Sequence, residues 1–169
     1  MRPGRARLTV AALAALGLVA ALAAYQAWSN GGTSPSPPLA CRLPHGVEQY
    51  PSLNTLPTAM REYLARRFAE PAHNPGIAER NAAYEVTDDN RSSLPMRRVI
   101  STGRWQTQWF LWYEHGGVAR HTHFVLLAPG SGESEPQVLA NITTSTRHLC
   151  ALTNAVLIGR APRSIEDEW

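Results

Sequence analysis

The second half of the chain is a series of short runs rich in β-branched and aromatic residues, separated by clusters of Gly, Pro, Ser, Asn and Asp. Such runs favour strands, and the clusters between them allow the chain to reverse direction. Short reversals join antiparallel strands, because parallel neighbours need a long crossover. The runs predicted as strands are residues 83–87, 97–102, 105–115, 118–127, 137–143 and 151–158. In the last run, the Ala and Leu content suits a helix, but Val156, Leu157 and Ile158 favour a strand.

One amphipathic helix is predicted ahead of these strands. Its apolar stripe recurs every four residues and consists of Leu56, Met60, Leu64 and Phe68. Thr55 suits the N-cap, Pro57 suits the first turn, and Pro71 stops the pattern. The sequence therefore predicts an α+β domain in which one helix packs on a curved antiparallel sheet, a meander of about five or six strands.

The N-terminal residues 1–28 carry a membrane-targeting signal. Arg2, Arg5 and Arg7 precede an apolar run at 8–24, and in such segments the basic end stays in the cytoplasm. The run of ~17 residues is short for a membrane span and long for a signal-peptide core. The small-x-small pattern Ala21-Leu22-Ala23 suits cleavage, whereas Tyr25 and Trp28 suit the interface of an uncleaved anchor. We expect residues 8–24 to hold the chain in the cytoplasmic membrane, with a cleaved signal peptide as the alternative.

The exported part divides into a tether and one folded domain. Residues 29–40 are rich in Gly, Ser and Pro and are expected to be a flexible tether. Residues 41–169 are long enough for one domain with its own core. Cys41 and Cys150 are the two cysteines of the chain, and an oxidising compartment favours a disulfide between them. We therefore predict a disulfide-closed domain in the periplasm, either anchored to the inner membrane or released from it.

The net charge of +3 comes from the targeting segment. All 16 basic residues are arginines, and three of them precede the apolar run, which leaves 13 against 13 acidic residues in the exported part. A domain without net positive charge lacks the electrostatic footprint of a nucleic-acid binder, so no nucleic acid is expected as a partner. The Ala- and Arg-rich, lysine-free composition is typical of a high-GC bacterium.

The segment WYEHGGVARHTHF at 112–124 predicts a β-hairpin. Two adjacent glycines between strand-like runs favour a two-residue type I′ turn at Gly116-Gly117. That turn would place His115 opposite Val118 and Trp112 opposite His121. Opposed residues share a face, so His115 is expected on one face. The expected members of the other face include Phe110, Trp112, Glu114, His121 and His123.

This predicted face supplies the candidate site. His121, His123 and Glu114 are the candidate residues for a metal or another ligand, because neutral imidazoles suit zinc, copper, nickel or iron. Phe110 and Trp112 are the candidate recognition surface, because exposed aromatic rings often contact partners. The simpler alternatives are histidines packed beside aromatic rings on a partly wet face, or acid–base use of one imidazole.

Two functions are compatible with this sequence, which contains no nucleotide-binding loop and no nucleophile elbow. The preferred one is a non-catalytic binding or structural module of the cell envelope, with no cofactor and with an envelope protein or small ligand as its partner. It predicts a tryptophan-bearing sheet face that is open to a partner. The alternative is a periplasmic metal-binding protein or metal-dependent enzyme that uses His121 and His123. It predicts that these two histidines converge with another histidine or a carboxylate.

Overall fold

The computed structural model describes residues 41–69, 76–87, 92–132, 134–167 and 169, so the predicted targeting segment and tether lie outside the described part. The described residues form one sheet of five antiparallel strands together with two α-helices, which confirms the α+β class. The elements, in chain order, are β1 (Glu48–Tyr50), the 3-10 turn η1 (Leu53–Thr55), α2 (Thr58–Ala69), β2 (Arg97–Trp105), β3 (Gln108–His115), β4 (His121–Ala128), β5 (Gln137–Thr144) and α3 (Leu149–Leu157).

The sheet is a meander in which each strand pairs with its neighbours in the chain, in the order β1-β2-β3-β4-β5. The predicted break at residues 103–104 is wrong, because β2 continues to Trp105 and the reversal occurs at residues 106–107. Gly103 is needed inside the strand, since a Cβ there would lie 2.2 Å from the Phe110 ring. The predicted strand at 83–87 is also wrong, and β1 was not predicted.

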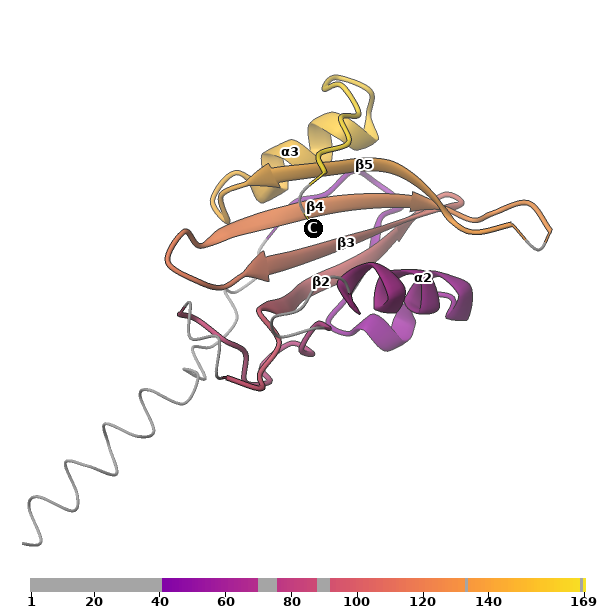
Figure 1. The fold of residues 1–169 in the computed structure, drawn as a ribbon. Helices are drawn as coiled ribbons and strands as arrows, with labels where there is room; N and C mark the ends of the chain where they lie inside the picture. Colours follow the sequence, from indigo (N-terminus) through magenta and orange to yellow (C-terminus); the bar gives the residue numbers. More distant parts are fainter. Residues whose placement is uncertain (1–40, 70–75, 88–91, 133, 168) are drawn as a thin grey trace, which may run out of the picture.

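Two helices cover the sheet, one on each face (Figure 1). The predicted stripe is buried against one face, in a cluster made of Leu56, Met60, Leu64, Phe68, Val99, Leu111, Tyr113, Val125, Leu127 and Trp169. The predicted start of the helix is wrong, because α2 begins at Thr58, whereas Thr55, the predicted N-cap, ends η1 and Leu56 is the C-cap of η1. The predicted stop at Pro71 lies outside the described residues. The other face is buried under α3, in a cluster made of Ile100, Phe110, Trp112, Phe124, Leu126, Ala140, Leu149, Val156 and Leu157. The expectation of a single helix therefore requires correction.

The stretch predicted as a strand at 151–158 is mostly the helix α3. Its buried residues Leu149, Thr153, Val156 and Leu157 follow the helical spacing, and Ile158 is the C-cap. β-branched residues disfavour a helix only weakly, and burial of an apolar face against the sheet overrides that preference. Because both faces of the sheet are buried, β2 also lacks the alternation of a half-exposed strand.

A disulfide joins Cys41 to Cys150, as predicted, with their Cα atoms 5.6 Å apart. It connects the first described residue to the first turn of α3. The side-chain amide of Asn154 donates a hydrogen bond to the main-chain oxygen of Arg42 at 2.9 Å, so the entry of the chain is fixed to α3 twice.

The last residues return to the face that α2 covers (Figure 1). We name residues 164–167 and 169 the C-terminal strap. It pairs in parallel with β5 at Asn141 and Ile165, and it ends with Trp169 buried in the α2 cluster. Trp169 packs edge-on against the rings of Tyr63 and Phe68. Within the described part of the chain, neither helix has the length and apolar character of a membrane span.

Candidate functional site

The β3–β4 pairing differs from the predicted hairpin by three residues. His115 lies opposite His121, and Tyr113 lies opposite His123, because the connection contains five residues, 116–120, in place of two. Successive side chains of a strand point to opposite faces, so an odd shift exchanges the faces of one strand relative to the other. The predicted separation of His115 from the other two histidines is therefore wrong.

The two glycines of this connection have different roles. Gly117 has a φ of 86° and takes the left-handed conformation, whereas Gly116 does not. A Cβ on Gly116 would lie 1.7 Å from the main-chain oxygen of Glu85 and 3.2 Å from that of Met96, so this glycine permits a close approach of the main chain at these two residues. Its N–H donates to the main-chain oxygen of Met96 at 2.7 Å. A type I′ turn needs positive φ at both positions, which explains why it does not form.

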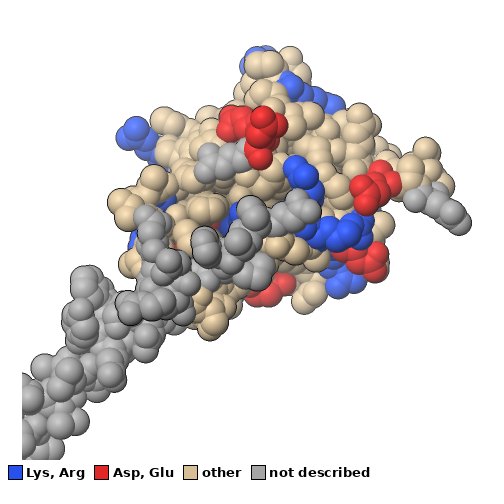
Figure 2. Space-filling view, viewed as in Figure 1, with Lys and Arg blue, Asp and Glu red and all other residues tan. Residues whose placement is uncertain are grey.

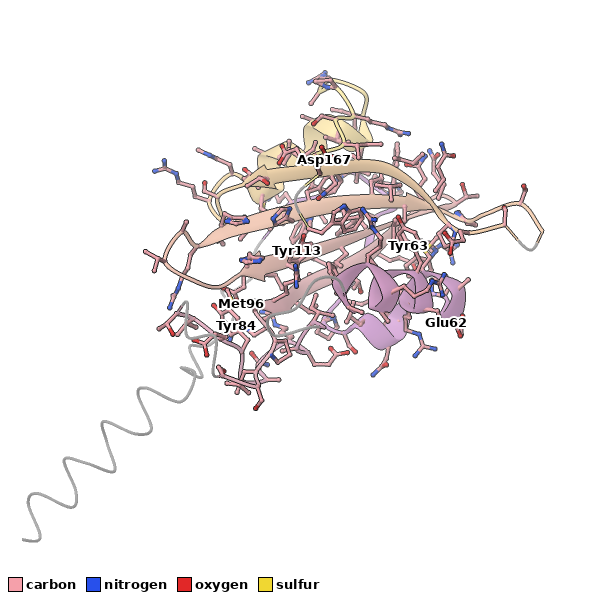
Figure 3. All side chains as sticks on the ribbon, viewed as in Figure 1. Glu62, Tyr63, Tyr84, Met96, Tyr113 and Asp167 are labelled. Carbon is pink, nitrogen blue, oxygen red and sulfur yellow. A yellow bond between two sulfur atoms is a disulfide. The ribbon has the colours of Figure 1, made fainter. Side chains whose placement is uncertain are left out.

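The corrected register gathers three histidines and a tyrosine in one row on the α2 side of the sheet. The ring centroids lie 5.1 Å apart for His115 and His121, 4.8 Å for His121 and His123, and 4.6 Å for His123 and Tyr113. We call these four side chains the imidazole row. Figure 3 shows Tyr113 on the side of the sheet that carries α2. His115 and His121 are partly exposed, and His123 is fully buried.

Each histidine of the row places Nδ1 beside an oxygen atom. Nδ1 of His115 lies 3.0 Å from the main-chain oxygen of Gly116, and Nδ1 of His121 lies 2.7 Å from that of Ala119. A carbonyl oxygen can only accept, so Nδ1 carries the proton in both rings. In the neutral tautomer, Nε2 then keeps its lone pair. This tautomer is common among metal-binding histidines, whose second nitrogen donates to an oxygen of the protein.

His123 is fixed in the same way by a side chain of β5. Its Nδ1 lies 3.2 Å from Oδ1 of Asn141, while Nδ2 of Asn141 donates to the main-chain oxygen of Glu166 at 3.0 Å. The second bond determines the orientation of the amide, so Oδ1 is the atom that faces His123 and accepts a hydrogen bond from its Nδ1–H. Nε2 of His123 is buried and has no hydrogen-bond partner among the described residues.

Burial lowers the pKa of His123 to about 4. The hydrogen bond with Asn141 opposes this shift, and the neighbouring imidazoles of His121 and His115 add to it by repulsion between charged rings. The ring is therefore neutral at neutral pH and keeps a lone pair on Nε2. A buried lone pair without a donor is costly, because the atom has lost its hydrogen bonds to water.

Glu114, a predicted member of the site, lies on the opposite face. In the corrected register it pairs with Thr122 and is adjacent to Arg98. Its Oε1 lies 2.6 Å from Nη2 of Arg98, and its Oε2 accepts a hydrogen bond from Tyr84 at 3.0 Å. The guanidinium of Arg98 also lies over the Tyr84 ring, 4.2 Å from its centroid. Glu114 thus belongs to a buried ion pair on the other side of the sheet from His121 and His123.

Phe110 and Trp112, the predicted recognition surface, are both fully buried in the α3 cluster. The indole N–H of Trp112 donates to Oγ1 of Thr153 in α3 at 2.9 Å. Both rings are core residues, so they do not form a surface that is open to a partner. The cause is α3, which covers both rings and whose residues were predicted as a strand.

The surroundings of the imidazole row limit the chemistry it can perform. Among the described residues, no three His, Cys, Asp or Glu side chains are grouped so that they could hold a metal ion. The arrangement is thus a row of nitrogens and not a closed cage. Arg97 lies opposite His115, and its Nε donates to the main-chain oxygen of Trp169 at 2.9 Å. Basic and acidic side chains are interspersed on this side of the molecule (Figure 2).

Three residues of this region were absent from the predicted site, namely His115, Tyr113 and Asn141. His115 and Tyr113 were missed because the register was wrong. Asn141 left a signal in the sequence, since it interrupts the apolar part of the run VLANI at 138–142. A polar residue inside a strand that is buried on both faces needs a partner.

Comparisons with protein-family models, with curated proteins and with solved structures gave no match to this chain.

Proposed function

We propose that this chain is a membrane-tethered binding module on the outer side of the cytoplasmic membrane, and that its ligand is a borderline divalent metal ion held by Nε2 of His121 and His123. The location is supported by the basic and apolar N-terminal sequence, and by the disulfide, which persists in oxidising compartments. The ligand is supported by the imidazole row.

The observation that carries the proposal is the convergence of His121 and His123 with a third histidine on one face. In the rings of His121 and His123, Nδ1 donates to an oxygen of the protein, so Nε2 is the unprotonated nitrogen, whose lone pair is the one suited to a metal. The competing proposal, a recognition surface at Phe110 and Trp112, lacks this support because both rings are buried.

Neutral imidazole selects the class of metal. Zinc, copper and nickel ions accept imidazole ligands, whereas magnesium and calcium prefer oxygen ligands. Two protein ligands leave coordination positions for water or for a group from another molecule. This open coordination favours a binding module over a permanently filled structural site, in which zinc has four protein ligands. His115 stacks on His121 and is the nearest further imidazole of the row.

A zinc titration of the full-length protein tests the proposal. We expect one zinc ion per chain in the wild type and no saturable binding in the double variant His121→Ala/His123→Ala, both measured by isothermal titration calorimetry. The matched control is His45→Ala/His148→Ala, which removes two exposed histidines outside the row and should bind as the wild type does. Equal binding by the wild type and the His121/His123 variant would refute the proposal.

A further inference from the structure

Asn141 connects the imidazole row to the C-terminal strap. Its main-chain N–H donates to the main-chain oxygen of Ser164 at 2.8 Å, and its main-chain oxygen accepts from the N–H of Glu166 at 3.0 Å. Its side chain donates through Nδ2 to the main-chain oxygen of Glu166 and faces His123 with Oδ1. One buried residue of β5 thus contacts the strap through three groups and the row through the fourth.

The strap has attachments beyond Asn141. A side-chain oxygen of Glu166 accepts a hydrogen bond from the main-chain N–H of Thr143 at 3.0 Å. The ring of Trp169 is buried in the α2 cluster, and the guanidinium of Arg67 lies 4.8 Å from its centroid. Arg97 bonds the main-chain oxygen of Trp169. The strap is therefore held on the sheet at two places, by Asn141 at residues 164–166 and by the burial of Trp169 at its end.

The orientation of the Asn141 amide decides which nitrogen of His123 is protonated. With the strap docked, Nδ2 donates to the main-chain oxygen of Glu166, so Oδ1 accepts a hydrogen bond from Nδ1–H of His123 and Nε2 is unprotonated. If the strap is released, the amide can rotate and present its N–H₂ group to Nδ1 of His123. Nδ1 then accepts a hydrogen bond, and the ring proton is carried by Nε2. A protonated Nε2 cannot bind a metal.

From this geometry we infer that Asn141 is the positioning residue of the site, and that the docked C-terminal strap sets the tautomer of His123 through it. The inference depends on the proposed function only where metal affinity is concerned. Because coupling between two binding events is reciprocal, a metal that binds Nε2 of His123 also stabilises the docked strap.

The positioning role is tested first in the metal-free protein, by the ¹⁵N chemical shifts of the His123 ring. We expect a protonated Nδ1 and an unprotonated Nε2 in the wild type, and a mixture of tautomers in Asn141→Leu. Trp169→Ala removes a ring that packs against Tyr63 and Phe68, and it should give the same mixture because it releases the strap. Asn141→Asp should retain the protonated Nδ1, because its carboxylate can only accept. An unchanged tautomer in Asn141→Leu would overturn the positioning role.

Zinc affinity is the second measurement. Loss of an outer partner of a metal-binding histidine lowers affinity about 10–100-fold, and we expect this loss in Asn141→Leu and in Trp169→Ala. Met60→Ala is the control, since it opens the same core cluster without removing a ring that anchors the strap. It should leave zinc affinity within about threefold of the wild type. An equal loss in Met60→Ala would show that general loosening of the core is the cause, and would overturn the role of the strap.

The third measurement is hydrogen exchange, which tests whether a bound metal stabilises the docked strap. Zinc should slow exchange of the Glu166 amide in the wild type and leave that rate unchanged in Asn141→Leu. If the wild type binds zinc but the exchange rate of its Glu166 amide does not change, the coupling is overturned. If the wild type binds no zinc, the proposed function fails, while the tautomer experiment still decides whether Asn141 positions His123.

Discussion

The ion pair between Arg98 and Glu114 is expected to stabilise the fold far more than an ion pair on the surface. The side chain of Arg98 is 1% exposed and that of Glu114 is 16% exposed, whereas Arg66 and Glu135 form a pair at 57% and 65% exposure. Removing one partner of a buried pair leaves an uncompensated charge in the core.

We therefore expect Glu114→Ala to lower the free energy of unfolding by about 3 kcal/mol. Glu135→Ala should change it by less than about 0.5 kcal/mol, because water screens the exposed pair. Urea denaturation of both variants at neutral pH makes the comparison. Similar effects of the two substitutions would contradict the burial of the Arg98–Glu114 pair.

Tyr84 gives this network a dependence on pH. Burial, followed by the charge of Glu114 and the hydrogen bond to it, raises the pKa of Tyr84 to about 12. The unfolded chain loses this proton near pH 10, whereas the folded chain keeps it up to about pH 12. Stability should therefore fall as pH rises through this window, by an amount on the order of 1 kcal/mol.

The measurement compares urea denaturation at pH 9 and pH 11 for the wild type and Tyr84→Phe. Phenylalanine keeps the ring beneath Arg98 and removes the ionisable group, so the variant should lose less stability over the same interval. A wild type and a variant that lose equal stability would show that Tyr84 ionises alike in the folded and unfolded chains.

At the scale of elements, the sequence predicts those features that depend on local periodicity. The stripe of α2 is such a feature, and its spacing of four residues is confirmed by burial of Met60, Leu64 and Phe68. The runs that became β2 to β5 were also found. The register of β3 and β4 was not predictable, because Gly116 is required by the close approach of Glu85 and Met96, which are distant in sequence. Because the predicted register was wrong, the sequence did not predict that His115, His121 and His123 lie in one row.

The prediction of a strand at 151–158 was wrong for a related reason, because the contacts of α3 with the sheet override the strand preference of its last residues. One of these contacts is the hydrogen bond from Trp112 to Thr153. Thr153→Val keeps the shape of the side chain and leaves the buried indole N–H unpaired. We expect a loss of about 1–3 kcal/mol in the free energy of unfolding. The control Thr146→Val alters an exposed residue before α3 and should have an effect within about 0.5 kcal/mol.

At the scale of the whole molecule, the disulfide connects residues that are 109 positions apart. A link of this span restricts the unfolded chain strongly, so Cys41→Ser/Cys150→Ser should lower the free energy of unfolding by about 2–5 kcal/mol. Urea denaturation of this variant and of the oxidised wild type measures the difference. Reduction of the wild type should reproduce the effect of the variant, which separates the loss of the covalent link from the change of side chain. A loss below about 1 kcal/mol would contradict this stabilising role.

The N-terminal segment is predicted to carry the domain across the cytoplasmic membrane, and its length is compatible both with an uncleaved anchor and with a cleaved signal peptide. An apolar run of ~17 residues is near the minimum for a span of the ~30 Å hydrocarbon core. If it is an uncleaved anchor, full-length protein should remain in the membrane fraction after alkaline extraction, with its disulfide formed and its domain open to protease in spheroplasts.

A charge at the centre of the run distinguishes the anchor from other modes of membrane association. Leu16→Arg places an arginine in mid-membrane at a cost of about 3 kcal/mol and should reduce the membrane-bound fraction, whereas Ser29→Arg lies beyond the run and should not. A shortened, soluble periplasmic protein would identify a cleaved signal peptide. Full-length protein in the cytoplasm, with reduced cysteines, would overturn the extracytoplasmic location, and a tether to the membrane would then have no role in presenting the imidazole row.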